Sequence, residues 1–472
     1  MFFDILKYKD NIALSDEYGK ELTYSDLDDL CDEICSHTEK RRLVFSFCEN
    51  RVGSVIGYIA FLNHDVVPVM ISAQIDEEFK NNLIKKYCPE YIWCPAHMKD
   101  DFIGMESVYE CFNYALIKTS YDKHYTLYDE LALMLTTSGS TGSPKFVRQS
   151  YTNIMANAKS IAQYLELDET ERPITTLPMN YTYGLSIINS HIIVGARLLI
   201  TDKGIAQKEF WNFFKKAGAT SFGGVPYTYE MLDRMRFMRM ELPSLRTMTQ
   251  AGGKLAPELH AKFAQYAQDT GKKFFIMYGQ CEATARMAYL PADKALIKKG
   301  SMGIAIPGGR FRLVDVDGST ITKPDVMGEL VYEGPNVTLG YAEQGEDLIK
   351  GDERGGILET GDLAKFDDEG YFYIVGRKKR FLKIFGNRVN LDEVDMLIKD
   401  EFSIDVTSAG IDDHMYIFIT DDSYSDRVKS FVVNATKLNH TAFQIVVIPE
   451  IPQNESGKIL YKELEEYYQV QR

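Results

Sequence analysis

The first 300 residues alternate short runs rich in β-branched residues with stretches whose apolar residues recur at helical spacing. For example, "RLVFSFCEN" (42–50) predicts a buried strand, "VGSVIGYIAFLNH" a helix and "VVPVMIS" the next strand. Such alternation is typical of parallel strands joined by helices. We therefore expect an α/β fold, with a large N-terminal body of mixed or parallel β-sheets and flanking helices.

The pattern changes near residue 300. "FRLVDVDGSTI", "GELVYEGPNV" and "LAKFDDEGYFYIVGR" show alternating hydrophobic residues and DG or EG turns, which favour antiparallel strands in a β-barrel-like part of the body. After "GRKKRFLKIFGNRVN" the helix and strand patterns indicate a small α+β C-terminal domain. We predict a boundary between residues 377 and 378, which gives domains of residues 1–377 and 378–472.

Charge limits the partners of this chain. The net charge is −15 over 472 residues, and "GRKKRFLK" is the one short basic cluster. Binding to nucleic acid or to an anionic membrane surface is therefore not expected, and a polyanionic ligand would need a local cationic site. No apolar run has the length of a membrane span, because "LSIINSHIIVGARLLI" is interrupted by His191 and Arg197.

The N-terminal segment and the cysteines indicate in which cellular compartment the protein works. The N-terminus has no basic segment and is acidic within four residues, unlike a signal peptide. Seven cysteines are scattered without the paired CxxC spacing of a zinc site. These features predict a reduced protein in the cytoplasm.

The segment "TTSGSTGSPK" (136–145) follows an apolar run and is dense in glycine and hydroxyl side chains. Gly139 and Gly142 allow consecutive N–H groups to point inward around an anion. Lys145 adds a positive charge that can reach a terminal phosphate. Pro144 stands where a Walker loop needs its second glycine, so this is not that motif. A plain Ser/Gly linker is the alternative.

This segment resembles the phosphate loop of the adenylate-forming superfamily, which includes acyl-CoA and aryl-CoA synthetases, peptide-synthetase adenylation domains and luciferases. "AGGKL" (251–255), "YGQCEAT" (278–284), the series from "ETGD" to "FGNRVN" and "PQNESGKILYKEL" resemble further motifs of that superfamily, in the same order. The resemblance covers almost the whole chain and implies binding of ATP and Mg²⁺.

The resemblance implies a role for each motif residue in binding the nucleotide. Glu282 would bind Mg²⁺, Tyr278 would stack on adenine, and Asp362 would accept the ribose hydroxyls with help from Arg377. Cys281 stands at the usual Thr, and a thiol is a weaker donor to the α-phosphate. The remaining residues implied in nucleotide binding are Thr137, Ser138, Gly139, Ser140, Gly142, Lys145, Gly252 and Gly279.

The resemblance also implies that the C-terminal domain is a mobile lid that serves two steps. Lys458 would bridge the attacking carboxylate to the α-phosphate, with Thr141 and Glu282 as further catalytic residues. Lys379 falls at the hinge, and Lys383 lies on the face presented to the thiol in the second step. For Lys378 and Arg380 we expect an ordinary solvated linker.

"LPMNYTYGLSI" (177–187) resembles the segment that lines the acyl pocket. Amino-acid-activating members carry an Asp at the position of Thr182, and a buried α-ammonium without a carboxylate partner is costly. Tyr181, Tyr183 and Tyr227, with Gly253, suggest a small or medium pocket with polar edges for an aryl or hydroxy-acyl acid. These aromatic residues equally fit plain core packing.

The predicted function is an ATP-dependent acid–thiol ligase. It would convert a non-amino carboxylic acid to acyl-AMP with release of pyrophosphate, and then transfer the acyl group to CoA or to the pantetheine of an acyl carrier protein. A stand-alone amino-acid adenylation enzyme that loads a carrier protein is the alternative, and nothing in the sequence argues for a luciferase-like oxygenase. A non-catalytic AMP-binding subunit is disfavoured because Lys145, Glu282, Asp362, Arg377 and Lys458 are all present.

Overall fold

The structure of this protein is a computed structural model that describes residues 2–136, 145–315, 317–453 and 459–469. The chain forms two compact units. The described residues of the first lie within Met1–Gly139, Ser143–Phe311 and Tyr332–Leu358, and those of the second within Arg312–Val331 and Glu359–Arg472. This division differs from the predicted boundary between residues 377 and 378, which stays a prediction.

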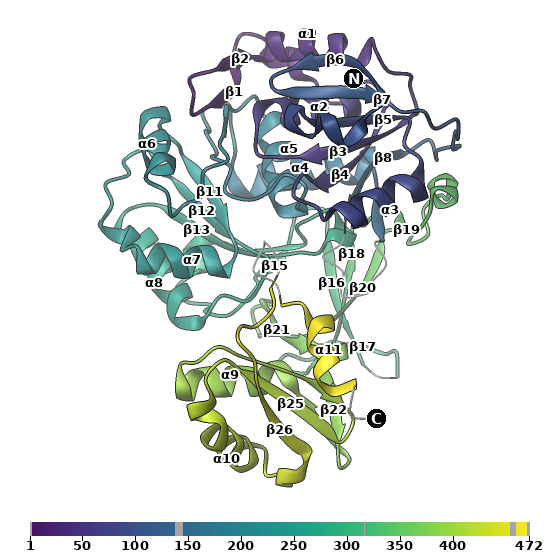
Figure 1. The fold of residues 1–472 in the computed structure, drawn as a ribbon. Coiled ribbons are helices and arrows are strands. Elements are labelled where there is room, and N and C mark those ends of the chain that lie inside the picture. Colours follow the sequence, from purple (N-terminus) through teal and green to yellow (C-terminus); the bar gives the residue numbers. More distant parts are fainter. Residues whose placement is uncertain (1, 137–144, 316, 454–458, 470–472) are drawn as a thin grey trace. The chain divides into compact units, whose positions relative to one another are not determined.

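The first unit contains an eight-stranded sheet in the order β19-β9-β8-β4-β3-β5-β7-β6 (Figure 1). Strands β8, β4, β3 and β5 are parallel, and the strands outside them pair antiparallel. β3 is buried along its whole length, as expected for a parallel strand covered on both faces. The strands are β3 (Leu43–Cys48), β4 (Val67–Ser72), β5 (Tyr91–Pro95), β6 (Glu106–Cys111), β7 (Tyr114–Lys118), β8 (Leu131–Thr136), β9 (Phe146–Ser150) and β19 (Gly340–Ala342).

Two further sheets complete the first unit. One has the order β11-β12-β13-β14-β15, parallel from β11 to β13 and antiparallel beyond, and the other has the order β10-β1-β2. The predicted mixed and parallel sheets are thus confirmed. The strands are β1 (Ile12–Asp16), β2 (Glu21–Thr23), β10 (Leu198–Ile200), β11 (Ser221–Gly224), β12 (Thr247–Gln250), β13 (Lys273–Tyr278), β14 (Ala288–Leu290) and β15 (Ile304–Ala305).

The helices of the first unit begin and end near their sequence signals. Ser150 accepts a hydrogen bond from the Asn153 N–H and caps the following helix. Gly218, in the left-handed region, ends another helix. The helices are α1 (Tyr24–Cys35), α2 (Val52–Asn63), α3 (Glu77–Tyr87), α4 (Tyr151–Leu165), α5 (Thr182–Ile192), α6 (Lys208–Ala217), α7 (Pro226–Arg234) and α8 (Pro257–Asp269).

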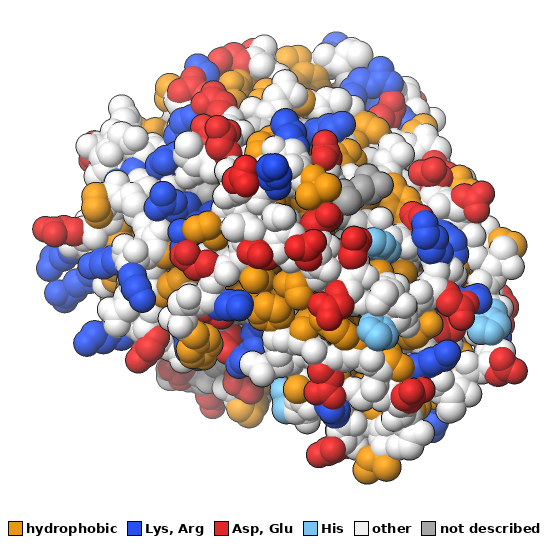
Figure 2. Space-filling view, turned by 90° about the horizontal axis from the view of Figure 1, so that it is seen from above, with side chains coloured by type: hydrophobic (Ala, Val, Ile, Leu, Met, Phe, Trp, Pro, Cys, Tyr) orange, Lys and Arg blue, Asp and Glu red, His pale blue; other side chains and the backbone are white. Residues whose placement is uncertain are grey.

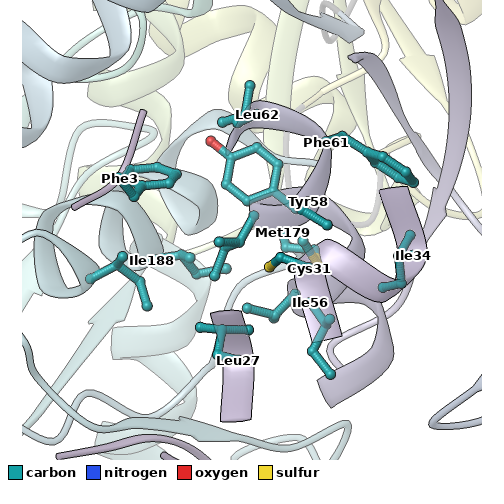
Figure 3. Close-up of a cluster of buried hydrophobic side chains, with 14 of the residues drawn as sticks. Phe3, Leu27, Cys31, Ile34, Ile56, Tyr58, Phe61, Leu62, Met179 and Ile188 are labelled. Carbon is teal, nitrogen blue, oxygen red and sulfur yellow. The ribbon is translucent and has the colours of Figure 1, made fainter. Parts of the chain in front are cut away.

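Helix α5 is held in a buried cluster together with α1 and α2 (Figure 3). The Tyr58 hydroxyl of α2 donates to Asn189 Oδ1 of α5 at 2.9 Å within this apolar surrounding. The core therefore fixes α5, whose first turn carries two of the predicted pocket residues. The members of the cluster labelled in Figure 3 are Phe3, Leu27, Cys31, Ile34, Ile56, Tyr58, Phe61, Leu62, Met179 and Ile188.

A buried arginine joins β9 to residues 339–353. The side chain of Arg148 is fully buried and donates to the carbonyl oxygens of Leu339 and Tyr341, each at 3.1 Å. It also donates to the carbonyls of Lys350 and Gly351 and pairs with the carboxylate of Glu353. One side chain thus fixes the path of residues 339–353. We call this set of contacts the Arg148 clamp.

The second unit holds most residues of a sheet in the order β17-β16-β18-β20-β21. The pairs β16–β17 and β20–β21 are antiparallel with turns closed at Gly318 and Gly370, which confirms the predicted hairpins. The sheet orders of the described residues include no closed barrel, so the barrel-like part is not confirmed. The strands are β16 (Arg310–Val314), β17 (Thr320–Ile321), β18 (Gly328–Glu333), β20 (Ile357–Phe366) and β21 (Phe372–Arg377).

The rest of the second unit is α+β, as predicted. The hairpin β22–β23 turns at Phe385 and Gly386, both with positive φ. A three-stranded sheet in the order β24-β25-β26 packs with helices. The elements are β22 (Phe381–Ile384), β23 (Asn387–Asn390), α9 (Leu391–Phe402), β24 (Val406–Ile411), β25 (His414–Ile419), α10 (Ser425–Thr436), β26 (Phe443–Val447) and α11 (Tyr461–Gln469).

The linker interpretation is wrong for Arg380. Its side chain is buried, pairs with Asp392 at 2.8 Å and Asp395 at 2.7 Å, and lies over the ring of Tyr461. Lys378, in contrast, is exposed and pairs with Glu329 at 2.7 Å. Arg380 is therefore a structural charge rather than part of a solvated linker.

The face of the molecule shown in Figure 2 carries charges of both signs. On the face in Figure 2, Lys and Arg side chains are interspersed with Asp and Glu. Within the part of the chain that the structure describes, no helix is both long and apolar enough to cross a membrane.

We expect Arg148→Met to lower the free energy of unfolding of the first unit by about 3–5 kcal/mol, because it leaves buried carbonyls and Glu353 without their donor. Denaturant unfolding followed by tryptophan fluorescence measures this, since Trp93 and Trp211 both lie in the first unit. The control is Arg42→Met, which removes an ion pair to the exposed Glu39 and should cost less than about 1 kcal/mol. Equal midpoints for the two variants would contradict the clamp.

Candidate functional site

The predicted pocket residues of α5 lie together at its N-terminal end. Thr182 Oγ1 donates to the carbonyl of Thr284 at 2.5 Å, and the Tyr183 hydroxyl lies 2.8 Å from Thr249 Oγ1. Burial raises the pKa of Tyr183 to about 12, so the phenol is neutral at physiological pH. These contacts fix the side chains of Thr182 and Tyr183 against β12 and the segment after β13.

The two glycines of "AGGKL" differ in their surroundings. Gly252 has a φ of +84°, and a Cβ there would lie 2.7 Å from the Tyr181 hydroxyl oxygen. The main chain at Gly252 therefore lies so close to Tyr181, and in such a conformation, that only glycine fits there. A Cβ at Gly253 would meet the ring of Pro226 at 3.0 Å. Tyr227, next in the chain, is 52% exposed, so the structure places it at the surface of α7.

The "YGQCE" segment follows β13 in a tight turn. A Cβ on Gly279 would lie 1.6 Å from the carbonyl oxygen of Ala285, which excludes any side chain. The main-chain oxygen of Glu282 accepts from the Thr338 N–H at 3.0 Å and from Arg354 Nη1 at 3.1 Å. The position of Glu282 is thus fixed by residues about 60 to 70 positions away in sequence. Tyr278 and Cys281 stand at the ends of this turn and are partly buried.

Tyr341 connects Glu282 with the end of the phosphate loop. Its hydroxyl donates to Glu282 Oε1 at 2.6 Å, and the Nζ of Lys145 lies 5.7 Å from the centre of its ring. Burial and the Glu282 carboxylate raise the pKa of Tyr341 to about 12. Arg354 also lies over this ring, at 4.8 Å. Tyr341 sits on β19, in the segment held by the Arg148 clamp.

Lys145 carries a second interaction. Its Nζ lies 2.7 Å from the carboxylate of Glu343, and this contact lowers the pKa of Glu343. Both side chains are partly exposed, so an incoming anion can reach the ammonium group. Lys145 and Glu282, which the sequence analysis assigned to one phosphate site, are therefore brought together around Tyr341.

The donor set fits Mg²⁺ that arrives with a phosphate ligand. Glu282 supplies one carboxylate oxygen, the hard ligand that this ion prefers, and protein sites of this kind complete the octahedron with water and substrate phosphates. Among the described residues, no group of three or more His, Cys, Asp or Glu side chains is arranged to hold a metal by itself.

In the second unit, the structure brings together the two residues predicted to bind ribose. Asp362 of β20 and Arg377 of β21 are register partners, and Arg377 Nε lies 3.3 Å from Asp362 Oδ1. The Asp362 side chain is buried, whereas that of Arg377 is half exposed. The hairpin register therefore provides a carboxylate acceptor beside a cation.

The remaining predicted residues are placed less completely. Lys383 lies exposed on β22, and its main-chain N–H and C=O bond to Asp412 and Asp413, each at 2.8 Å. Lys379 lies between β21 and β22, and its side chain is outside the described part. The predicted residues Thr137, Ser138, Gly139, Ser140, Thr141, Gly142 and Lys458 also lie outside the described residues.

The comparisons with known proteins agree with this fold. The family model of the AMP-binding enzymes matches residues 4–342. The chain is 25% identical to a 2-succinylbenzoate–CoA ligase of Bacillus cereus, over 96% of this chain and 95% of that protein. It is 28% identical to an oxalate–CoA ligase of Arabidopsis thaliana, over 70% of this chain and 66% of that protein.

Two solved structures share the fold over nearly the whole chain. One is ATP-bound MatB from Rhodopseudomonas palustris, with a TM-score of 0.80, 20% identity and coverage of 99% of this chain and 97% of that one. The other is o-succinylbenzoate CoA synthetase from Bacillus subtilis with ATP and magnesium ion, with a TM-score of 0.78, 20% identity and coverage of 98% of both chains.

A buried histidine on α5 makes the stability of the first unit depend on pH. Nδ1 of His191 lies 2.8 Å from the carbonyl of Ile187 and so carries the proton, while Nε2 is buried with no partner among the described residues. Burial lowers the pKa of His191 from 6.5 to about 4. The unfolded chain therefore binds a proton more readily than the folded chain between these values.

We expect the free energy of unfolding to be unaffected by His191 above pH 6.5. As the pH falls from 6.5 toward 4, protonation of the unfolded chain at His191 should lower it by about 3 kcal/mol in total. In His191→Gln the loss between pH 6.5 and 4 should be smaller by that amount, as measured by tryptophan fluorescence in denaturant. His97→Gln, at a histidine whose side chain is 68% exposed, should retain the wild-type pH dependence. An unchanged pH dependence in His191→Gln would refute the assignment.

Proposed function

The chain belongs to the family of AMP-binding enzymes, and from that premise we propose that it is an ATP-dependent acid–thiol ligase. It activates a carboxylic acid as acyl-AMP with release of pyrophosphate, and then transfers the acyl group to a thiol with release of AMP. The observation that supports the proposal is that Lys145 and Glu282 both contact Tyr341, because a cation and a carboxylate that lie this close together suit the binding of phosphate groups with Mg²⁺.

The chemistry requires positioning and charge compensation. A carboxylate is a poor acyl donor because its leaving group would be oxide. When its oxygen attacks the α-phosphorus of ATP, the bond from that phosphorus to the bridging oxygen breaks and pyrophosphate leaves with the electron pair. Lys145 attracts the departing phosphates, and preorganised charges of this kind supply most of the rate enhancement. Mg²⁺ bound at Glu282 would neutralise further phosphate charge.

Other predicted residues hold the rest of the nucleotide. Asp362 accepts the ribose hydroxyls with Arg377 beside it, and Tyr278 stacks on adenine with Gly252, Gly279 and Cys281 nearby. The loop residues Thr137, Ser138, Gly139, Ser140, Thr141 and Gly142 grip the phosphates. Lys458 bridges the attacking carboxylate to the α-phosphate in the first step. In the second step Lys383 faces the thiol after rotation at Lys379.

The acid is not an α-amino acid. The hydroxyl of Thr182, which stands where an acidic residue would pair with an α-ammonium, is already committed to the carbonyl of Thr284. The guanidinium of Arg286 lies 5.1 Å from the centre of the neighbouring Tyr183 ring and would repel a second cation. Tyr181, Tyr183 and Gly253 line the acyl pocket, with the exposed Tyr227 at its edge.

The thiol acceptor is CoA. Support comes from the relatives, which are named as CoA ligases. The pantetheine of an acyl carrier protein is the alternative acceptor, and capture of the thioester with CoA or with a holo carrier protein distinguishes the two.

The protein works in the reducing cytoplasm without nucleic acid, consistent with seven cysteines, all among the described residues, that form no disulfide.

Lys458→Ala should reduce ATP–pyrophosphate exchange on the order of 10²–10³-fold, the range seen when one donor to developing charge is removed. Exchange is measured with a panel of aliphatic, aryl, hydroxy, dicarboxylic and amino acids. Lys462→Ala, at an exposed lysine of the adjacent α11, is the matched control and should keep full activity. Full exchange in Lys458→Ala would overturn the mechanism, and exchange with α-amino acids alone would overturn the substrate class.

Tyr341→Phe should raise the Mg²⁺ concentration for half-maximal exchange about tenfold or more, because loss of a hydrogen bond that orients a metal ligand weakens metal binding by this order. The ring remains under Lys145 and Arg354, so only the Glu282 contact is lost. Tyr114→Phe, which removes a buried hydroxyl that contacts Phe47 and Glu49, should leave the Mg²⁺ dependence unchanged. An identical Mg²⁺ dependence in both variants would count against the role of Tyr341.

A further inference from the structure

Three arginine side chains are buried among the described residues, and one of them differs in its partners. Arg148 pairs with Glu353, and Arg380 pairs with Asp392 and Asp395. Arg286, which is 2% exposed, forms no ion pair within the described part of the chain. A buried charge is normally retained only when an opposite charge or a full set of hydrogen bonds compensates its desolvation.

The partners of Arg286 are neutral. Nε donates to Ser186 Oγ at 3.2 Å, and Nη1 donates to the Tyr164 hydroxyl at 3.0 Å and lies 3.2 Å from Met277 Sδ. The ring of Tyr183 covers the guanidinium at 5.1 Å. No hydrogen bond of Nη2 is found with the described residues. Two hydroxyls, a thioether and a ring satisfy the group only in part, because Arg carries five donors.

These partners place Arg286 in the wall of the proposed acyl pocket. Tyr183 and Ser186 lie on α5, the helix that begins at Thr182, and Met277 lies on β13 just before the "YGQCE" turn. Arg286 itself follows that turn. It also lines a small cavity beside the pocket wall, together with Gly223, Thr249 and His191. His191 contributes an unpartnered Nε2 to this polar surrounding.

We propose that Arg286 binds a second anionic group of the substrate, and that the preferred acid is therefore a short dicarboxylic acid. The inference rests on the proposed function, because it names the substrate of the same site. The carboxylate remote from ATP supplies the opposite charge that the protein does not provide to Arg286. Charge-assisted hydrogen bonds from a guanidinium fork to a carboxylate are among the strongest in proteins.

The length of the acid follows from the helix. Thr182 and Ser186 are four residues apart on α5, a separation of about 6 Å along the axis. An acid whose reacting carboxylate lies beside Tyr181 and Gly252 therefore reaches Arg286 after about one helical turn. This distance suits a dicarboxylic acid of about four to six carbons and excludes a long fatty acid.

A purely structural role for Arg286 predicts a different outcome. Replacing a buried charge with an apolar side chain of similar volume is often neutral or stabilising for folding. Arg286→Met should therefore unfold at the same or a higher temperature than wild type, while it loses activity on dicarboxylic acids. A residue needed only for packing would instead lose stability and activity on all acids together.

The test compares each dicarboxylic acid with its own monoamide, which has the same shape without the second charge. Exchange is measured with succinate, glutarate and adipate, with their monoamides, and with butyrate, hexanoate and benzoate. In wild type we expect kcat/KM to favour the diacids about 10- to 100-fold over the monoamides, the range for one hydrogen bond to a charged group. Arg286→Gln should lose this preference, mainly through a higher KM for the diacids.

Two further variants control for folding and for charge. Arg286→Lys retains the charge without the fork and should retain part of the diacid preference. Tyr164→Phe removes a neutral partner of Arg286 and leaves its charge, so it should keep the preference at some cost in stability. Thermal unfolding of each variant shows that it is folded.

The outcomes separate the inference from the proposed function. A wild-type enzyme that uses monoamides or monocarboxylic acids as well as diacids overturns the inference and leaves the ligase function standing. The same diacid preference in wild type and in folded Arg286→Gln or Arg286→Met also overturns it. Exchange with none of the acids overturns the proposed function, and the inference falls with it. If Arg286→Gln and Arg286→Met do not fold, the ratio of kcat/KM for diacids to that for monoamides, measured in wild type and in Arg286→Lys, still tests the inference.

Discussion

The burial of the Arg148 guanidinium is the constraint on which the proposed phosphate site depends. A charge without access to water must find acceptors, and here four main-chain carbonyls and Glu353 supply them. Because all of these acceptors lie between residues 339 and 353, β19 takes a single path along β9. That path puts the hydroxyl of Tyr341 on the Glu282 carboxylate and its ring beside Lys145. A core interaction thus sets the geometry of groups that meet ATP in the proposed reaction.

The free-energy cost of burying a guanidinium group is compensated differently at Arg148, Arg380 and Arg286. Arg148 is satisfied mainly by carbonyls, and Arg380 by two aspartates and an aromatic ring. Arg286 has neutral partners only, among the described residues. The comparison separates structural charges from one whose compensation has to come from a ligand. The type of partner, rather than burial as such, is what distinguishes them.

Local chemistry explains which predictions succeeded. The alternation of strands and helices and the hairpins that turn at Gly318 and Gly370 depend on residues a few positions apart, so the sequence alone predicted them. Asp362 and Arg377 meet because a hairpin register pairs them. Arg380 was misassigned although Asp392 and Asp395 are only 12 and 15 positions away, because these partners lie on the following helix and no hairpin register pairs them with Arg380. Tyr341, Arg354 and Arg286 were missed because their partners lie far away in sequence. The Tyr341–Glu282 contact joins residues 59 positions apart, and Arg286 contacts a tyrosine 122 positions away.

The Arg148 clamp also bears on how this region can evolve. Arg148 holds residues 339–351 through main-chain carbonyl oxygens, which every amino acid possesses. These hydrogen bonds do not depend on the side chains of the segment. Mutations can therefore accumulate along this segment without altering the path of the backbone, as long as Arg148 and its partner Glu353 persist. Tyr341, which faces the phosphate site, is an exception. Related proteins can therefore carry different side chains on this segment, and so make different interactions beside the nucleotide site, while the backbone path stays the same.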